Sequence, residues 1–246
     1  MKYLKIILSI LIFISSANAN TIFYLIKIPN LEIHSGKSAN GLKYLKAIKP
    51  FSVGIRDNNV SCFNSNKKDI EIKMPIIEKN LNKYSSEFLN KINLKYIILC
   101  ENLSVAQISA AGVPNSITKT LIIDIKFNEE HFERVLHHEI FHMINDSHKK
   151  KFVDEEWKNF NNLEFKYAKC STCTDKLGLS LLKKNKGFVT EYSMSTASED
   201  MAEVFSFLII SKKKIENKAL MDPILKKKIL YIKRKILEID KNFKFN

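Results

Sequence analysis

The stretch VLHHEIFHMIND, residues 135–146, contains three of the six histidines of the chain. Histidines four residues apart lie on one side of a helix, so His138 and His142 can bind one Zn²⁺ together. Glu139 would then lie near the open coordination position, where a carboxylate can take a proton from water. His137 points elsewhere and is predicted to be a bystander. The HExxH motif alone is short, and a buried, hydrogen-bonded pair of histidines is the alternative interpretation.

The stretch is predicted to lie on a helix that has Asn128 as its N-cap and Glu129 and Glu130 in its first turn, near the positive end of the helix dipole. One side of this helix is a broad apolar arc, formed by Phe132, Val135, Leu136, Ile140, Met143 and Ile144. At about 100° per residue, Glu139 falls within the same arc. A carboxylate there is costly unless a polar group meets it, so Glu139 needs a partner.

A second stretch, residues 187–210, can supply the third ligand that the two histidines lack. Thr196 or Ser198 can cap a helix there, on which Glu199 and Glu203 lie one turn apart. If this helix packs against the HExxH helix, Glu199 completes a His₂Glu site and Glu203 can orient a ligand histidine. The alternative for Glu199 is the acid of a capping box with Thr196.

These residues resemble the glutamate-zincins, zinc metallopeptidases that include the catalytic domain of anthrax lethal factor and related bacterial zinc-binding peptidases. In that group a tyrosine lies seven residues before the third ligand and an acid lies four residues after it, which are the positions of Tyr192 and Glu203 relative to Glu199. The connector at residues 152–168 is also similar, with Trp157, Asn161 and Tyr167. The resemblance covers about residues 118–210.

The resemblance implies that His138, His142 and Glu199 bind one Zn²⁺ per chain, with Glu139 as general base and then proton donor. It implies that Tyr192 donates a hydrogen bond to the oxyanion and that Glu203, without binding the metal itself, orients a ligand histidine. The implied fold is α+β and zincin-like: a small mixed sheet with an edge strand over the site, the HExxH helix and a second ligand-bearing helix. The implied substrate is a peptide or protein bound in extended conformation.

The predicted strand at residues 118–127 resembles the edge strand on which such enzymes lay a peptide. An ordinary core strand is an equally good interpretation of the same apolar run. Other predicted strands are residues 21–28, 31–36, 49–57 and 94–100. Predicted helices span residues 75–91, with Pro75 in the first turn, and residues 222–239, a basic amphipathic segment. Gly112 and Pro114 predict a loop between the last two strands.

The N-terminus has the pattern of a secretory signal peptide. Lys2 and Lys5 precede an apolar run that is too short to span a membrane comfortably, and small residues follow it up to Ala19. Cleavage after Ala19 predicts a secreted or periplasmic protein without a transmembrane segment. The remaining chain is divided into an N-terminal α/β lobe at residues 20–93 and a zincin-like catalytic region at residues 94–246.

Four cysteines enter an oxidising compartment if the signal peptide is used, so disulfides are expected. We predict the pairs Cys62–Cys100 and Cys170–Cys173. The spacing of Cys170 and Cys173 also fits a redox dithiol or half of a structural zinc site. No βαβ pattern and no second Cys/His pair at finger spacing accompanies it, which favours the disulfide.

The chain carries a formal net charge of +14, which raises the question of acidic partners. Its lysines are dispersed rather than gathered beside aromatic residues or glycines, so nucleic acid is not the expected partner. The main hypothesis is a secreted or periplasmic zinc-dependent endopeptidase. The alternatives are a non-catalytic secreted binding protein with a peptidase-like zinc site, and a basic module that binds anionic membrane or nucleic acid through residues 222–239.

Overall fold

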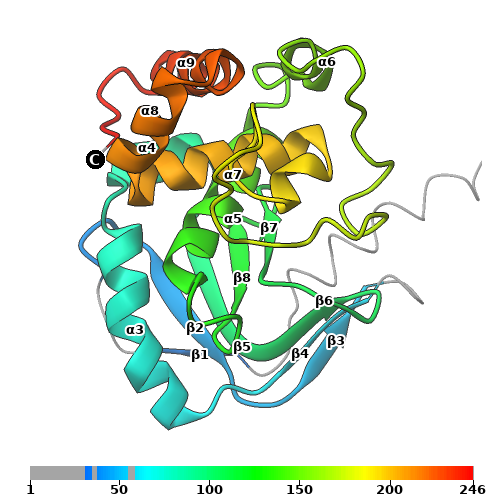
Figure 1. Cartoon of the computed structure of the whole chain (residues 1–246). Helices are drawn as coiled ribbons and strands as arrows, with labels where there is room; N and C mark the ends of the chain where they lie inside the picture. The colour runs from blue at the N-terminus through cyan, green and yellow to red at the C-terminus, as the bar shows by residue number, and fades with distance from the viewer. Residues whose placement is uncertain (1–30, 35–37, 55–58, 246) are drawn as a thin grey trace, which may run out of the picture.

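The computed structural model describes residues 31–34, 38–54 and 59–245 (Figure 1). The predicted signal peptide and the predicted strand at residues 21–28 lie outside these ranges. Within them the protein has an α+β fold, as predicted, with a mixed sheet covered by helices. The strands are β1 (Leu31–Ile33), β2 (Lys43–Ala47), β3 (Phe51–Val53), β4 (Val60–Phe63), β5 (Tyr96–Val105), β6 (Ile108–Ser109), β7 (Gly112–Asn115) and β8 (Thr120–Asp124).

Strand β5 is the centre of the sheet. It pairs in parallel with β2 and β8 along its first half, and antiparallel with β4 and β6 along its second half. Its side chains alternate between two cores: Ile97 and Leu99 pack under the helices, whereas Ile98 and Cys100 join a smaller cluster on the opposite face. A strand with both faces buried reads as a continuous apolar run, which is why YIILC was recognisable in the sequence.

Strand β7, rather than the predicted strand at residues 118–127, is the edge strand beside the HExxH helix. The predicted segment forms β8, which is interior because it pairs with β5 on one side and with β7 on the other. Among the described strands, β7 pairs only with β8. The prediction of a loop at Gly112 and Pro114 is therefore wrong, because an edge strand tolerates proline where a central strand does not.

The first helices begin earlier or later than predicted. Helix α3 (Lys67–Leu81) starts at the N-cap Asn66, whose side chain accepts a hydrogen bond from the Lys68 N–H, so Pro75 lies inside it. A separate helix, α4 (Ser86–Lys91), is capped by Ser85. The HExxH helix, α5, spans Phe132–Ser147, because the Asn128 side chain caps a preceding turn through the His131 N–H instead of starting the helix.

Of the remaining helices, α7 (Ala197–Ile210) packs directly on α5, and the others contact α7 (Figure 1). These are α6 (Asp154–Lys158), the 3₁₀ turn η2 (Tyr192–Met194), α8 (Lys212–Leu220) and α9 (Pro223–Ile239). Thr196 caps α7 and Asp222 caps α9, so both helix starts agree with the sequence pattern. The apolar face of α9 is buried against the main core, where Leu225, Ile229 and Ile232 contribute to packing.

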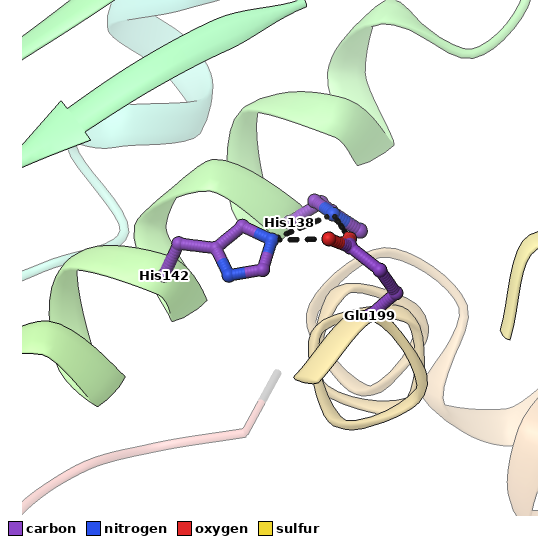
Figure 2. A group of neighbouring side chains, drawn as sticks. All are labelled: His138, His142 and Glu199. Atoms are coloured by element: carbon purple, nitrogen blue, oxygen red, sulfur yellow. Dashed lines mark hydrogen bonds and ion pairs between the residues drawn. The ribbon is translucent and has the colours of Figure 1, made fainter. Parts of the chain in front are cut away.

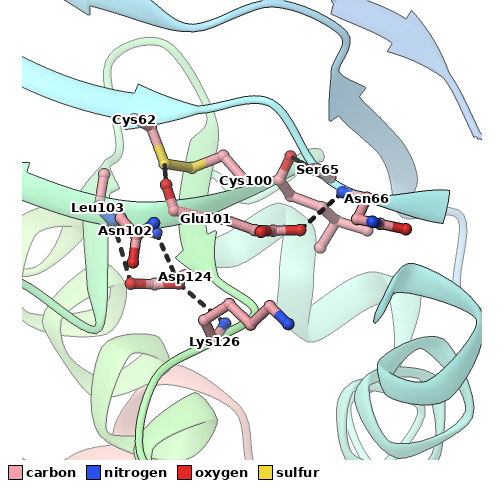
Figure 3. The surroundings of a disulfide bond; sticks show 10 residues. Cys62, Ser65, Asn66, Cys100, Glu101, Asn102, Leu103, Asp124 and Lys126 are labelled. Carbon is pink, nitrogen blue, oxygen red and sulfur yellow. Dashed lines mark hydrogen bonds between the residues drawn. A yellow bond between two sulfur atoms is a disulfide. The ribbon is translucent and has the colours of Figure 1, made fainter. Parts of the chain in front are cut away.

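Both predicted disulfides are present. Cys62–Cys100 joins β4 to β5 (Figure 3), and Cys170–Cys173 closes a short loop in the connector between α6 and α7. Such bonds are typical of oxidising compartments. Among the described helices, none is long and apolar enough to cross a membrane. Strands from both sides of the predicted domain boundary at residue 93 share the sheet, and the division into lobes stays a prediction.

Candidate metal centre

His138, His142 and Glu199 come together from two helices (Figure 2). Nε2 of His138 lies 2.8 Å from Oε2 of Glu199 and 3.0 Å from Nε2 of His142, and the latter nitrogen lies 3.2 Å from the same Glu199 oxygen. The histidines are one turn apart on α5, and Glu199 reaches them from the first turn of α7. Three residues proposed from the sequence therefore direct one ligand atom each toward a common point.

The three ligand atoms fit a zinc ion. A tetrahedral Zn²⁺ with bonds of about 2.0–2.1 Å holds its ligand atoms about 3.3 Å apart. The observed separations are slightly shorter, so a small outward movement of the side chains would accommodate the ion. The side chains of His142 and Glu199 are 19% and 13% exposed, which leaves one side of the group open to solvent. Two imidazoles, one carboxylate and an open side are typical of catalytic zinc sites.

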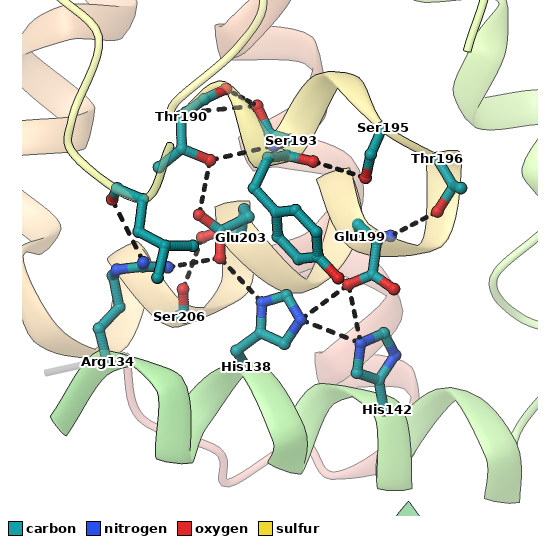
Figure 4. Close-up of polar contacts among 12 residues, drawn as sticks. Arg134, His138, His142, Thr190, Ser193, Ser195, Thr196, Glu199, Glu203 and Ser206 are labelled. Carbon is teal, nitrogen blue, oxygen red and sulfur yellow. Dashed lines mark hydrogen bonds and ion pairs between the residues drawn. The ribbon is translucent and has the colours of Figure 1, made fainter. Parts of the chain in front are cut away.

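Glu203 supports His138 from behind (Figure 4). Its Oε1 lies 2.8 Å from Nδ1 of His138 and also accepts a hydrogen bond from the Arg134 guanidinium, while its Oε2 accepts one from the Thr190 hydroxyl at 2.7 Å. Arg134 in turn donates to the Leu179 carbonyl at 3.3 Å. A carboxylate on the far nitrogen of a ligand histidine fixes its tautomer and ring orientation, which is the arrangement found behind zinc ligands.

The charges of this group are those of a cation site. Burial alone would lower the pKa of His138, but hydrogen bonds to Glu199 and Glu203 raise it to about 10. Burial would raise the pKa of Glu199, yet the charges and hydrogen bonds of His142 and His138 hold it below its usual range. Two ionised acids therefore retain a proton on an imidazole between them. A divalent cation bound by the same atoms would take the place of that positive charge.

Glu139 lies beside the ligands and under the edge strand. Glu139 is only 8% exposed, and burial raises the pKa of its carboxyl above the ordinary value. Gly112 of β7 faces it so closely that a Cβ atom at position 112 would lie 2.7 Å from Cγ of Glu139. Glu139, which the helical spacing places within the apolar arc, thus lies between the metal ligands and β7. A buried carboxyl with a raised pKa in such a place is suited to accept and pass on a proton.

The outer backbone edge of β7, next to Glu139, pairs with no other strand of the part of the chain that the structure describes. The Asp124 N–H donates to the Ala111 carbonyl at 3.0 Å, and the register pairs Val113 with Ile122. Because hydrogen-bonding direction alternates along a strand, Gly112 and Pro114 direct their backbone groups away from β8. Gly112 can offer an N–H and a carbonyl at this edge, whereas Pro114 offers only a carbonyl.

Tyr192 lies beside His138. Its half-buried ring has its centroid 5.8 Å from that of His138. Burial, together with the nearby carboxylates of Glu199 and Glu139, raises the pKa of Tyr192, so the hydroxyl keeps its proton. The Tyr192 N–H donates a hydrogen bond to the Gly178 carbonyl at 3.1 Å, which ties η2 to the loop that follows the Cys170–Cys173 disulfide. A protonated phenol near the ligands can donate a hydrogen bond to a developing oxyanion.

His137 faces away from the group. Its Nδ1 lies 2.6 Å from the Tyr84 hydroxyl and its Nε2 lies 3.0 Å from Oδ1 of Asn80, in a completely buried position. Burial and the positive charge of Lys83 hold its pKa well below the usual value, so the ring is neutral. His137 is outside the candidate metal site, and it joins α5 to α3.

Asp200, the residue after Glu199, faces a second buried network. Its Oδ2 accepts hydrogen bonds from Lys228 Nζ at 2.6 Å, the Tyr167 hydroxyl at 2.6 Å and Trp157 Nε1 at 2.9 Å. The side chains of Asp200 and Lys228 are both 0% exposed. The aromatic residues of the connector motif therefore anchor the first turn of the helix that carries Glu199.

Three supporting residues were not recognised in the sequence: Arg134, Thr190 and Asp200. Arg134 left a usable signal, because it lies one turn before His138 on the same side of the helix and would be unpaired in an apolar setting. Asp200 left a weaker one as a second acid in the first turn of α7, where the helix dipole alone explains it. Nothing in the local sequence marks Thr190, since its hydrogen bond to Glu203 is visible only in the tertiary structure.

The fold and the donor set define a candidate mononuclear metal site on an α+β scaffold. A family model described as "Putative zinc-binding metallo-peptidase" matches residues 76–240. This match covers more than half of the chain, so the protein belongs to that family. No curated protein matches the chain.

The chain is similar to a solved structure from Bacteroides caccae, described as a "putative zinc-binding metallo-peptidase". It shares 18% sequence identity over 92% of this chain and 88% of the other, with a TM-score of 0.47. That similarity is too low to bear on the site of this chain. The predicted membership among zinc-binding peptidases is confirmed by the family match, and the resemblance to anthrax lethal factor stays a prediction.

Proposed function

We propose that this protein is a zinc-dependent endopeptidase that hydrolyses peptide bonds, with one Zn²⁺ per chain held by His138, His142 and Glu199. The observation that carries the proposal is the convergence of the three ligand atoms, with Glu139 beside them under an open strand edge. A zinc ion in this position supplies Lewis-acid chemistry, polarising the scissile carbonyl and making water nucleophilic near neutral pH.

The side chains of the protein transfer the proton, stabilise the oxyanion and orient the metal ligands. Glu139 takes a proton from the attacking water and passes it to the leaving amine nitrogen, which the raised pKa of its buried carboxyl favours. Tyr192 donates a hydrogen bond to the oxyanion. Glu203 and Arg134 keep the His138 ring in the orientation needed for ligation.

The substrate is proposed to be an extended peptide that pairs with β7. An added strand gains main-chain hydrogen bonds from a free edge, which gives affinity with little dependence on sequence. Strand β7 runs beside α5, and at its end the backbone N–H of Ser116 donates to Asp146 of that helix at 3.1 Å. A peptide on β7 would therefore be led past Glu139, next to Gly112.

The proposed location is the periplasm or the outside of the cell. The N-terminal segment up to Ala19 has the pattern of a cleavable signal peptide. The two disulfides support the same location, since such bonds persist in oxidising compartments.

The proposal is tested with purified protein by measuring bound zinc and cleavage of a mixed peptide library. We expect one zinc per chain and cleavage that stops with a chelator. Glu139→Gln should keep the zinc and lose cleavage, whereas Glu130→Gln, an exposed acid just before the same helix, should behave as wild type. Zinc without any cleavage by the wild-type protein would instead support the non-catalytic binding protein. Cleavage that persists in Glu139→Gln would refute the proposed mechanism.

A further inference from the structure

Gly112 is in unusually close contact with the side chain of Glu139. A Cβ atom on residue 112 would lie 2.7 Å from Cγ and 2.9 Å from Cδ of Glu139, and 3.1 Å from the Ile122 carbonyl oxygen. Real Cβ atoms essentially never approach other heavy atoms closer than 3.0 Å. Any residue other than glycine at this position therefore forces a neighbour to move.

The backbone conformation does not explain the glycine. The φ angle of Gly112 is outside the left-handed region, unlike those of Gly41 and Gly187, so an alanine could adopt the same conformation. Glycine also weakens a strand, because it loses more entropy on folding and offers no side chain to pack. What distinguishes position 112 is then the lack of room for a side chain, and its closest contact is with Glu139.

The side chain of Glu139 is the part that would yield to an added Cβ. Strand β7 is held on one side by its pairing with β8, where Gly112 lies opposite Ile123. It is held on α5 by Ser116, whose backbone N–H and hydroxyl both donate to Asp146. The metal ligands lie on α5 and α7 and do not involve β7. The Glu139 carboxylate is therefore the movable group between two fixed elements.

We propose that Gly112 is a positioning residue for Glu139: the missing side chain sets the place of the Glu139 carboxylate between the metal ligands and the open edge of β7. This inference rests on the proposed peptidase function. Residue 112 would then control the position of the Glu139 carboxylate without contributing to metal binding. Gly112 also presents its own N–H and carbonyl at that edge, so the base and the first pairing point of a peptide are set by one residue.

The activity test uses Gly112→Ala in the full-length protein as it is exported, with Val113→Ala as the matched control on the neighbouring strand position, which packs against the smaller core on the other face. We expect Gly112→Ala to keep wild-type zinc affinity and to lower kcat about 100-fold, the loss that a misplacement of about 1 Å can cause. Val113→Ala should keep most of its activity. Wild-type kcat in Gly112→Ala would overturn the inference, whereas inactive wild-type protein would instead contradict the peptidase function.

A stability test keeps the inference falsifiable without activity. The shift in unfolding midpoint caused by Gly112→Ala is measured in the wild-type and in the Glu139→Ala background, both with chelator present. If the added Cβ overlaps with Glu139, the substitution should lower the midpoint in the wild type and lower it less, or raise it, in Glu139→Ala. Equal shifts in both backgrounds would mean that the overlap is with the Ile122 backbone, and the inference would then be wrong.

Discussion

On each of the helices α5 and α7, two consecutive residues belong to different polar regions of the protein. On α5, His138 joins the candidate metal site while His137 joins Tyr84 and Asn80 on the other side. On α7, Glu199 joins the metal site while Asp200 joins the Lys228 network. The first region is partly open to solvent, whereas His137, Asp200 and Lys228 in the two networks behind it are completely buried.

The two regions differ in how their charges are balanced. Behind the site, His137 has neutral partners and stays neutral, and Asp200 is matched by Lys228. In the site, Glu199 and Glu203 raise the pKa of His138 to about 10; Arg134 matches one of the two negative charges, and the other is balanced only by a titratable proton on the imidazole. Burial alone therefore does not identify a functional histidine. An incomplete charge balance next to an opening does so better.

The largest effect is expected on metal binding from His138→Ala, which removes one proposed ligand together with its hydrogen bond to Glu203. Zinc affinity should fall by more than the about 10–100-fold that changes behind metal ligands cause. Equilibrium competition with a chelator measures this. His131→Ala, at the start of the same helix and outside the ligand group, is the control and should retain zinc. Equal affinity in both variants would remove the distinction between the two regions.

A large effect on stability is expected from Lys228→Met, because it leaves Asp200 buried without its cation. Removing one member of a buried ion pair costs about 3–5 kcal/mol of unfolding free energy. Urea denaturation with chelator present measures it, with the exposed Lys227→Met as control. Adding Asp200→Asn to Lys228→Met should recover part of the loss. A loss no larger than that of Lys227→Met would show that the network behind the site is not a stabilising ion pair.

An intermediate effect is expected from Glu203→Gln, which keeps the shape of the side chain and removes its charge. Zinc affinity should fall about 10–100-fold, as for other groups that orient a ligand histidine. Isothermal titration with zinc measures the change, and Asp200→Asn serves as a comparison on the same helix. If Asp200→Asn weakens zinc binding more than Glu203→Gln, then the buried network controls the ligands more strongly than their direct contact does.

The smallest effect is the pH dependence contributed by His137. Its folded pKa is well below the unfolded value of about 6.5, so below that pH only the unfolded chain binds the proton. The unfolding free energy should therefore fall as the pH drops through 6.5, with a slope that approaches about 1.4 kcal/mol per pH unit well below that value. His137→Gln should lack this part of the slope between pH 6.5 and 5.5, while the contribution of His138 is common to both proteins. Identical slopes would count against a neutral buried His137.

The sequence was informative where a short spacing determines geometry. Histidines at positions 138 and 142 must share a helix face, and the Thr196 cap placed Glu199 in a first turn. Strand β7 was missed because Gly112 and Pro114 normally mark a loop, and the unpaired edge that tolerates them is a tertiary property. The Asn128 cap was assigned to the helix because a turn and a helix start share the same side-chain hydrogen bond.

Partners far apart in the chain could not be predicted from spacing. Arg134 and Glu203 lie 69 residues apart, and their contact depends on how α5 and α7 cross. The same holds for Lys228, whose position in a helix with many lysines gave no sign that it alone is buried with an acid. Apolar periodicity predicts which side of a helix is inside, but it does not tell which polar residues accompany it.

The Lys228 network also constrains the order of assembly. Lys228 lies on α9, 28 residues after its partner Asp200, and Asp200 directly follows the proposed third ligand Glu199. A chain that still lacks α9 during synthesis or export would have to bury Asp200 without a cation, so the start of α7 would not be held in place. Metal binding at the candidate site should therefore follow the docking of α9.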